Sequence, residues 1–325
     1  MSIKKIAEIS GVSKSTVSRY LTGGYVSEEN KKKIKEAIDK TGFIPSFAAQ
    51  SLRTKVTKQI GVIIPKLNSD SISKMVAGIT EILNKEGYYV VLGNTDNNEQ
   101  EEIKYLSLFD ENHVDGIILL GTVLTNEHHK AMCNIKIPLV VLSQYHEEFP
   151  CVYFDSYDAA KKVTKAVINH KKYPAMISAR LDDLSTGKER QEGYYDCLKE
   201  EGIESVGLVY SGFSFESGYE ACKKLMDLYP NCDSIFCSTD HMALGALTYL
   251  NKIGKKIPSD ISIGSVGGSD ICLMSNPTVT NANLEYYNSG KKAAQLLMSL
   301  LRKENVEQKI KTMFELNYNQ STIND

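Results

Sequence analysis

The sequence contains no long apolar run. None of its segments approaches the roughly 18 consecutive apolar residues that a membrane-spanning helix requires. Its first residues include lysines but no apolar segment of the kind that marks a secretory signal. We therefore expect a cytoplasmic protein. Its 325 residues, 42% of them apolar, are enough for more than one core.

Paired cysteines are also missing. The seven cysteines stand at positions 133, 151, 197, 222, 232, 237 and 272, without a CxxC pair. This odd and scattered set predicts reduced, mostly buried thiols and no metal site. His128 and His129 lie in a polar stretch, so we expect a solvated pair rather than metal ligands. No nucleophile elbow or phosphate-binding loop is recognisable, and Gly267-Gly268 is too short for one, so the sequence indicates neither an enzyme nor a cofactor.

Charge is distributed unevenly along the chain. Residues 1–58 hold twelve Lys or Arg against five Asp or Glu, a net charge of +7. Because the whole chain carries −2, residues 59–325 carry −9. A basic head on an acidic body is typical of a nucleic-acid-binding module joined to a second function. Binding driven by phosphate neutralisation should weaken steeply with added salt.

The basic segment begins with two short helical patterns joined by a glycine turn at 10–12. The first pattern places three apolar residues on one face of a 3.6-residue period: Ile3, Ile6 and Ala7. Ser13 stands where an N-cap of the second helix belongs. That helix has an apolar stripe of Val17, Tyr20 and Leu21. Its other side carries polar and basic residues: Lys14, Ser15, Ser18 and Arg19.

Two helices held at an angle, the second with polar residues outward, indicate a helix-turn-helix whose second helix enters the DNA major groove. A plain helical hairpin is the alternative on these residues alone. A third helix is predicted over 27–41, with Ser27 as its N-cap and Gly42 after its end. Pro45 stops the preceding element, and residues 48–52 would form a helix too short to be stable without a partner.

Beyond residue 58, short apolar runs alternate with helical patterns almost to the end of the chain. Strands are predicted at 60–65, 88–93, 114–120, 138–143, 152–154, 175–181, 206–211, 234–239, 261–266 and 279–284. Helices are predicted at 72–86, 99–112, 158–169, 187–201, 214–228, 241–253 and 286–301. Apolar strands separated by helices indicate parallel sheets covered on both faces. We predict two doubly wound α/β lobes, with a ligand at the carboxyl ends of the strands.

Four stretches recur at the spacing of one family: 12–19 (VSKSTVSR), 42–45 (GFIP), 49–53 (AQSLR) and 60–65 (IGVIIP). With them the sequence resembles the lac repressor/galactose repressor family of bacterial transcription regulators over nearly its whole length. Residues 65–70 and 75–78 are similar to the sucrose-type repressors of Gram-positive bacteria. The resemblance implies a DNA-binding headpiece at 1–45, a hinge helix and linker at 46–58, and a body at 59–325 like that of type I periplasmic binding proteins. Lobe 1 would hold about 59–154 and 286–314, and lobe 2 about 155–285 and 315–325.

The resemblance also implies which residues meet DNA. The base-reading helix and the hinge would supply Ser13, Lys14, Ser15, Thr16, Ser18, Arg19, Ala49, Gln50, Leu52 and Arg53. An arginine at position 19 can contact a guanine edge through two hydrogen bonds. Leu52 matches an apolar wedge that enters the minor groove and bends the duplex. The alternative for Leu52 is a linker leucine that packs on its own domain.

An effector site is implied in the cleft between the lobes. Its expected residues are Asn68, Ser69, Asp70, Arg190, Phe213, Phe215, Thr239 and Asp240. Alternatives stay open for several of them: a surface salt bridge for Arg190, a helix N-cap for Asp240, and core packing for the two phenylalanines. The family often has an Asp where this chain has Gly267, so either that contact is lost or Asp270 replaces it.

We therefore expect a repressor of carbohydrate-utilisation genes that binds a palindromic operator as a dimer and is released by a small sugar or sugar phosphate. No leucine heptads follow the body, so a tetramerising coiled coil is not expected. One alternative is a regulator that uses a corepressor, such as a purine, or a phosphoprotein partner. Another is a sugar-binding transport protein, against which the basic head argues.

Overall fold

The computed structural model describes residues 2–21, 24–43, 56–111 and 114–323. The chain divides into two compact units, one of Met1–Lys58 with His113–Asp115 and one of Gln59–Asn112 with Gly116–Asp325. We call them the headpiece and the body and describe each by itself. No helix among the described residues is long and apolar enough to cross a membrane.

Three helices form the headpiece: α1 (Ile3–Ser10), α2 (Lys14–Leu21) and α3 (Glu28–Thr41). They close around a small core of Ile6, Ala7, Val17, Val26, Ile34, Ala37 and Phe43. Gly11 ends α1 in the left-handed conformation at φ 69°, where a side chain would be strained, and so makes the turn into α2. The Ser13 hydroxyl accepts a hydrogen bond from the Thr16 backbone at 3.1 Å, as an N-cap does. Ser27 precedes α3 but makes no such side-chain bond.

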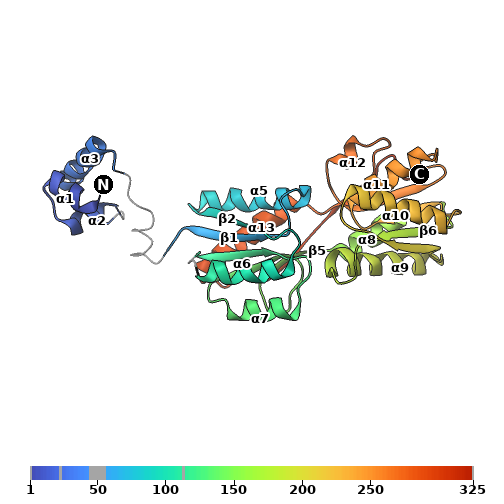
Figure 1. Cartoon of the computed structure of the whole chain (residues 1–325), viewed down its shortest axis with the longest axis horizontal. Helices are drawn as coiled ribbons and strands as arrows, with labels where there is room; N and C mark the ends of the chain where they lie inside the picture. Colours follow the sequence, from blue (N-terminus) through green and yellow to red (C-terminus); the bar gives the residue numbers. More distant parts are fainter. Residues whose placement is uncertain (1, 22–23, 44–55, 112–113, 324–325) are drawn as a thin grey trace. The chain divides into compact units, whose positions relative to one another are not determined.

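Two six-stranded sheets form the body (Figure 1). The sheet of lobe 1 has the order β11 (Lys309–Thr312), β5 (Cys151–Phe154), β4 (Leu139–Ser143), β3 (Gly116–Leu120), β1 (Gln59–Ile64) and β2 (Tyr89–Asn94). The sheet of lobe 2 has the order β12 (Glu315–Asn317), β10 (Thr280–Asn283), β9 (Ser262–Gly267), β8 (Ser234–Cys237), β6 (Pro174–Ser178) and β7 (Gly207–Tyr210). All neighbouring strands are parallel except β12, which runs antiparallel to β10.

Helices cover both faces of each sheet. In lobe 1 they are α5 (Asp70–Lys85), α6 (Glu99–Glu111), α7 (Asn126–Asn134) and α13 (Tyr286–Leu301). In lobe 2 they are α8 (Ser156–Val167), α9 (Arg190–Glu201), α10 (Phe215–Leu228), α11 (Asp240–Lys252) and the short α12 (Ile271–Met274). Alternation along β1 shows why both faces are covered: Ile60 and Val62 pack with the α5–α13 layer, while Gly61 faces Phe109 of α6. The predicted doubly wound α/β body is therefore confirmed.

The chain passes between the lobes three times. It leaves lobe 1 between β5 and α8, returns between β10 and α13, and leaves again between β11 and β12. Three connecting segments thus join the two lobes, an arrangement that suits a hinge motion about a cleft.

Glycines let paired helices approach closely. A Cβ on Gly78 of α5 would lie 2.0 Å from the Tyr287 carbonyl oxygen, and a Cβ on Gly290 of α13 would lie 2.1 Å from that of Met75. Gly218 and Gly245 have the same relation between α10 and α11. Because the obstructing atoms are backbone, these four helices need glycine at their crossings.

Several elements differ from the sequence prediction. The edge strands β11 and β12, helices α7 and α12, and a π-helical segment at Leu184–Glu189 were not predicted. The strand expected at 175–181 ends at Ser178, and the helix expected at 187–201 begins at Arg190, because the π-helical segment occupies its first turn. The edge strands escape prediction because their sequences, KIKT and ELN, are largely polar and partly exposed.

Candidate functional site

The exposed side of α2 carries Lys14, Ser15 and Arg19, three of the predicted DNA-binding residues. All three are exposed, and Ser13 bonds to the Ser15 and Thr16 hydroxyls at 2.7 and 2.8 Å. A side chain from this helix therefore meets solvent at each of these positions, as contact with a duplex requires. Arg19 is not packed inward.

Ser18 corrects one expectation. It was predicted on the outward side of α2, but it is only 7% exposed. Because α2 packs against both α1 and α3, its buried arc is wider than the stripe of apolar residues. The hinge candidates Ala49, Gln50, Leu52 and Arg53 lie outside the described residues.

A cavity of about 360 Å³ opens between the two lobes of the body, within the usual size of small-molecule sites. Segments that follow the carboxyl ends of β1, β3 and β4 line it from lobe 1, and segments after β6, β7, β8 and β9 line it from lobe 2. All eight predicted effector residues line this cavity: Asn68, Ser69, Asp70, Arg190, Phe213, Phe215, Thr239 and Asp240. They meet because the ends of parallel strands gather at one edge of each sheet.

Arg190 lies at the base of the cavity. Its side chain is 3% exposed, and Nη1 donates hydrogen bonds to the carbonyl oxygens of Ser238 and Val266, at the ends of β8 and β9. Arg190 is therefore not the surface salt-bridge residue that was the alternative for this position. Among the described residues its Nε has no hydrogen-bond partner, although it is buried. A buried donor without a partner costs free energy unless a ligand or water satisfies it.

Asp240 is fixed by the adjacent loop. Its carboxylate accepts hydrogen bonds from the Ser265 hydroxyl and the Ser269 backbone N–H, both at 2.6 Å. The N-cap of α11 is Thr239, whose hydroxyl accepts from the Met242 N–H, so Asp240 itself is not the cap.

The loop also settles the question of the missing Asp. A Cβ on Gly267 would lie 2.4 Å from Asp240 Oδ2, so a side chain there would displace the Asp240 carboxylate from its hydrogen bonds to Ser265 and Ser269. Asp270 does not take its place, because its exposed carboxylate pairs with Lys74 at 3.2 Å and does not line the cavity.

The two phenylalanines are not core residues. Phe213 and Phe215 are 39% and 38% exposed and both line the cavity. Two partly exposed rings beside carboxylates are the combination by which a site offers an apolar plate and hydrogen-bond acceptors to one ligand.

Sequence reasoning missed other residues of the cavity, among them Gln144 and Asp183, which join the two lobes. Gln144 follows β4 and donates from Nε2 to the Thr122 carbonyl at 2.9 Å and, across the cleft, to Asp183 Oδ1 at 3.1 Å. Burial raises the pKa of Asp183. Burial likewise raises the pKa of Glu189, which ends the π-helical segment and does not line the cavity, to about 7. The available signal was position alone, since Gln144 directly follows an expected strand and Asp183 precedes an expected helix.

Several polar contacts join the lobes across the cleft. Besides Gln144 with Asp183, the Ser269 hydroxyl donates to Asp70 Oδ2 at 2.9 Å, and Lys74 pairs with Asp270 and donates to the Gly268 carbonyl oxygen at 3.4 Å. The described structure therefore holds the lobes together through atoms that belong to the cavity and its rim.

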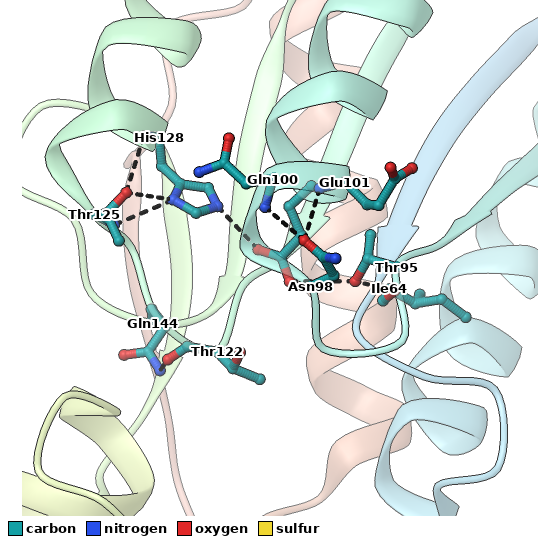
Figure 2. A network of polar contacts seen from close by, with 10 residues as sticks. Ile64, Thr95, Asn98, Gln100, Glu101, Thr122, Thr125, His128 and Gln144 are labelled. Atoms are coloured by element: carbon teal, nitrogen blue, oxygen red, sulfur yellow. Dashed lines mark hydrogen bonds and ion pairs between the residues drawn. The ribbon is translucent and has the colours of Figure 1, made fainter.

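The expectation for His128 was wrong. It is fully buried, and the Thr125 backbone N–H donates to its Nδ1 at 3.2 Å, which leaves the proton on Nε2 to face Glu102 at 3.2 Å. Figure 2 shows the imidazole turned back to Thr125, and Gln144 beside Thr122. Thr125 caps α7 and brings His128 toward the sheet, where Glu102 from another helix satisfies it. Its neighbour His129 remains partly exposed.

Comparison with known proteins agrees with this geometry. The family described as bacterial regulatory proteins of the lacI family matches residues 2–46. The family described as periplasmic binding proteins and sugar binding domain of LacI family matches residues 57–320.

Curated relatives match along the whole length. The sucrose operon repressor of Staphylococcus xylosus is 30% identical over 312 residues, which cover 95% of this chain and 96% of that protein. The ribose operon repressor of Bacillus subtilis (strain 168) is 30% identical over 305 residues, covering 93% and 92%.

Solved structures share the fold. The transcription regulator CcpA of Lactococcus lactis, 30% identical, superposes with a TM-score of 0.76 over 82% of this chain and 99% of its own. The Lac repressor bound to ONPG reaches a TM-score of 0.90 over 99% of both chains at 20% identity. The family resemblance inferred from the motifs is confirmed: the chain belongs to the lacI family of bacterial regulatory proteins.

Proposed function

We propose that this protein is a repressor of carbohydrate-utilisation genes, which binds a palindromic operator as a dimer and is released when a neutral sugar occupies the cavity between its lobes. The observation that carries the proposal is the meeting of all eight expected effector residues in one cavity, in a chain that also carries a basic helix-turn-helix headpiece. A ligand that contacts both lobes stabilises one relative arrangement of the lobes over another. Such a shift between arrangements can control DNA binding.

The charges of the cavity favour an uncharged ligand over a sugar phosphate. Four carboxylates line it: Asp70, Asp183, Glu216 and Asp240. Carboxylates accept hydrogen bonds from sugar hydroxyls and repel phosphate. Two cations also line it, Lys66 and Arg190, and the Nη1 of the buried Arg190 is already engaged by two carbonyl oxygens.

The relatives do not name the sugar. The sucrose operon repressor and the ribose operon repressor are each 30% identical to this chain. Equal similarity to regulators named for a disaccharide and a pentose supports a carbohydrate effector. It does not indicate the size of the sugar, for which the volume of the cavity is the guide. Its volume of about 360 Å³ lies near the lower end of the usual range, about 300–1,000 Å³, which suits a small sugar.

The test begins with DNA. The full-length protein is used to select binding sites from random duplexes, and gel shifts on the selected site are repeated with neutral sugars and with the corresponding sugar phosphates. We expect a two-fold symmetric site, because a symmetric dimer presents two recognition helices. We also expect release by at least one neutral sugar. Failure to enrich any sequence would refute a DNA-binding role.

Two variants separate the parts of the proposal. Arg19→Ala should weaken operator binding and leave sugar binding intact. Asp240→Asn should weaken sugar binding, read as a smaller thermal shift, and leave DNA binding intact. A ligand present at about 100 times its dissociation constant adds about 2.7 kcal/mol of stability, which such a shift detects. A ligand that strengthens DNA binding instead would identify a corepressor.

A further inference from the structure

We propose that His129, Cys133 and Glu148 form a binding site for one zinc-class transition-metal ion on lobe 1, apart from the cavity. His129 and Cys133 stand one turn apart on α7, and Glu148 lies in the segment between β4 and β5. One ligand atom from each lies within 4.8 Å of the others. None of the three lines the cavity between the lobes.

Two of the three separations between the ligand atoms fit a tetrahedral ion, and the third, from Cys133 to Glu148, is within 4.8 Å. Zinc bonds of about 2.0–2.1 Å to nitrogen, about 2.3 Å to sulfur and about 2.0–2.2 Å to oxygen place ligand atoms about 3.4–3.6 Å apart at the tetrahedral angle. His129 Nε2 lies 3.5 Å from Cys133 Sγ and 3.5 Å from Glu148 Oε1. Both separations thus match edges of a zinc tetrahedron, and the fourth position is left for water.

Hydrogen bonding alone accounts poorly for the same cluster. The Nε2 of a neutral imidazole either donates one hydrogen bond or accepts one. Here that single atom faces both a thiol and a carboxylate. A cation at the common point satisfies all three atoms, with the Cys133 thiol releasing its proton to solvent as it binds.

Neighbouring residues hold the ligands in place. The His129 ring stacks on His146 with centroids 5.7 Å apart and planes 3° from parallel. The segment that carries Glu148 is tied back on itself, since the backbone N–H of Glu148 donates to His146 Nδ1 at 3.1 Å. Lys309 of β11 donates to the His146 and Phe149 carbonyl oxygens and fixes the segment to the sheet. Ligands supported in this way lose little freedom on binding an ion.

The ligand set selects the class of metal. Imidazole, thiolate and one carboxylate suit zinc, cobalt or nickel, whereas magnesium and calcium prefer oxygen alone. A bound ion would connect α7 to the segment that begins with Gln144, the residue that reaches across the cleft to Asp183.

The test uses the full-length, reduced protein, freed of metal with a chelator that is then removed. Zinc is titrated in competition with a chromophoric chelator. We expect one ion per chain and at least a tenfold loss of affinity in each of Cys133→Ser, His129→Ala and Glu148→Gln. Glu147→Gln, on the adjacent residue, and His170→Asn, on an exposed histidine of lobe 2, are the matched controls and should keep the affinity of the unaltered protein.

Cobalt provides a second readout that needs no variant. Thiolate ligation gives cobalt a charge-transfer absorption in the near ultraviolet, so the unaltered protein should develop that band and Cys133→Ser should not. No stoichiometric zinc binding by the unaltered protein, no such band with cobalt, or full affinity in Cys133→Ser would each overturn the proposal. Melting temperatures without metal establish that the variants are folded.

Discussion

The contact between Ser269 and Asp70 offers a direct test of how the lobes are held together. Ser269→Ala removes the hydroxyl that donates to Asp70 Oδ2 at 2.9 Å across the cleft. It leaves the backbone N–H of residue 269, which donates to Asp240 at 2.6 Å within lobe 2. The substitution therefore deletes one bond between the lobes and keeps the loop in place.

The expected size of the effect follows from the charge and exposure of the partners. A hydrogen bond to a charged group contributes about 1.5–3 kcal/mol. The lower end applies because the Asp70 side chain is 37% exposed and water replaces the serine when the lobes part. About 1.5 kcal/mol corresponds to roughly a tenfold shift toward separated lobes. The other contacts across the cleft remain: Gln144 with Asp183, Lys74 with the Gly268 carbonyl oxygen, and the partly exposed pair of Lys74 with Asp270, which contributes at most about 1 kcal/mol.

Pulsed electron paramagnetic resonance measures this shift as a distance distribution between spin labels. One label goes on Cys133 of lobe 1, which is the exposed cysteine among the described residues, and one on a cysteine introduced at the exposed Lys224 of lobe 2. Burial raises the pKa of Cys197 to about 11 and of Cys232 to about 12, so these thiols react slowly. Labelled chains are diluted with unlabelled ones, so that only distances within one chain are recorded.

The control is Ser275→Ala, in a serine whose hydroxyl donates to the Cys272 and Pro277 carbonyl oxygens inside lobe 2. We expect the longer-distance population to grow in Ser269→Ala and to stay constant in the control. Identical distributions in both variants and in the unaltered protein would show that this bond does not help to hold the lobes together.

Three further outcomes are expected. Gly290→Ala should lower the free energy of unfolding in urea by about 1–3 kcal/mol, because its Cβ would lie 2.1 Å from the Met75 carbonyl oxygen; a gain in stability would contradict the close crossing. Glu189→Gln should raise the free energy of unfolding at pH 8 by about 1 kcal/mol, discounted for partial exposure, because folding raises the pKa of Glu189 from 4.5 to about 7 and so penalises the ionised carboxylate. That gain should be complete above pH 7 and disappear as the pH falls toward 4.5 in thermal or urea unfolding, and a gain that grows toward low pH would reverse the sign. Arg19→Ala should weaken binding to the selected operator by about 1–3 kcal/mol and relax the sequence preference at one base pair of each half-site, and an equal loss on every DNA sequence would place Arg19 on the phosphates.

Most of the fold could be predicted because its strands are buried on both faces. The segments of β1, β3 and β4 are almost wholly apolar and lie between helical patterns, so periodicity and length identify them. The strands β11 and β12 lie at sheet edges and carry polar residues. Their pairing depends on partners far along the chain, and no local pattern encodes it.

The site was predictable to the extent that position along a strand encodes it. Phe213 and Thr239 come just after strands, and parallel topology then brings them to one cavity. Burial of polar groups was not predictable, because it depends on distant partners. His128 is buried through Glu102, 26 residues away, and Ser18 through its position between two other helices. Polar neighbours in the sequence give no sign of either.

Gly267 shows how a departure from the family pattern acquires meaning only in three dimensions. In the sequence it indicates the loss of one carboxylate from the effector site. In the structure, the space that a side chain at 267 would fill is occupied by the Asp240 carboxylate, which Ser265 and the Ser269 backbone hold in place. The glycine and the orientation of Asp240 therefore depend on each other. Ser269 also donates to Asp70 in the other lobe. A ligand that bound the Asp240 carboxylate would therefore act on a loop that contacts both lobes, and this would couple occupancy of the cavity to the separation of the lobes.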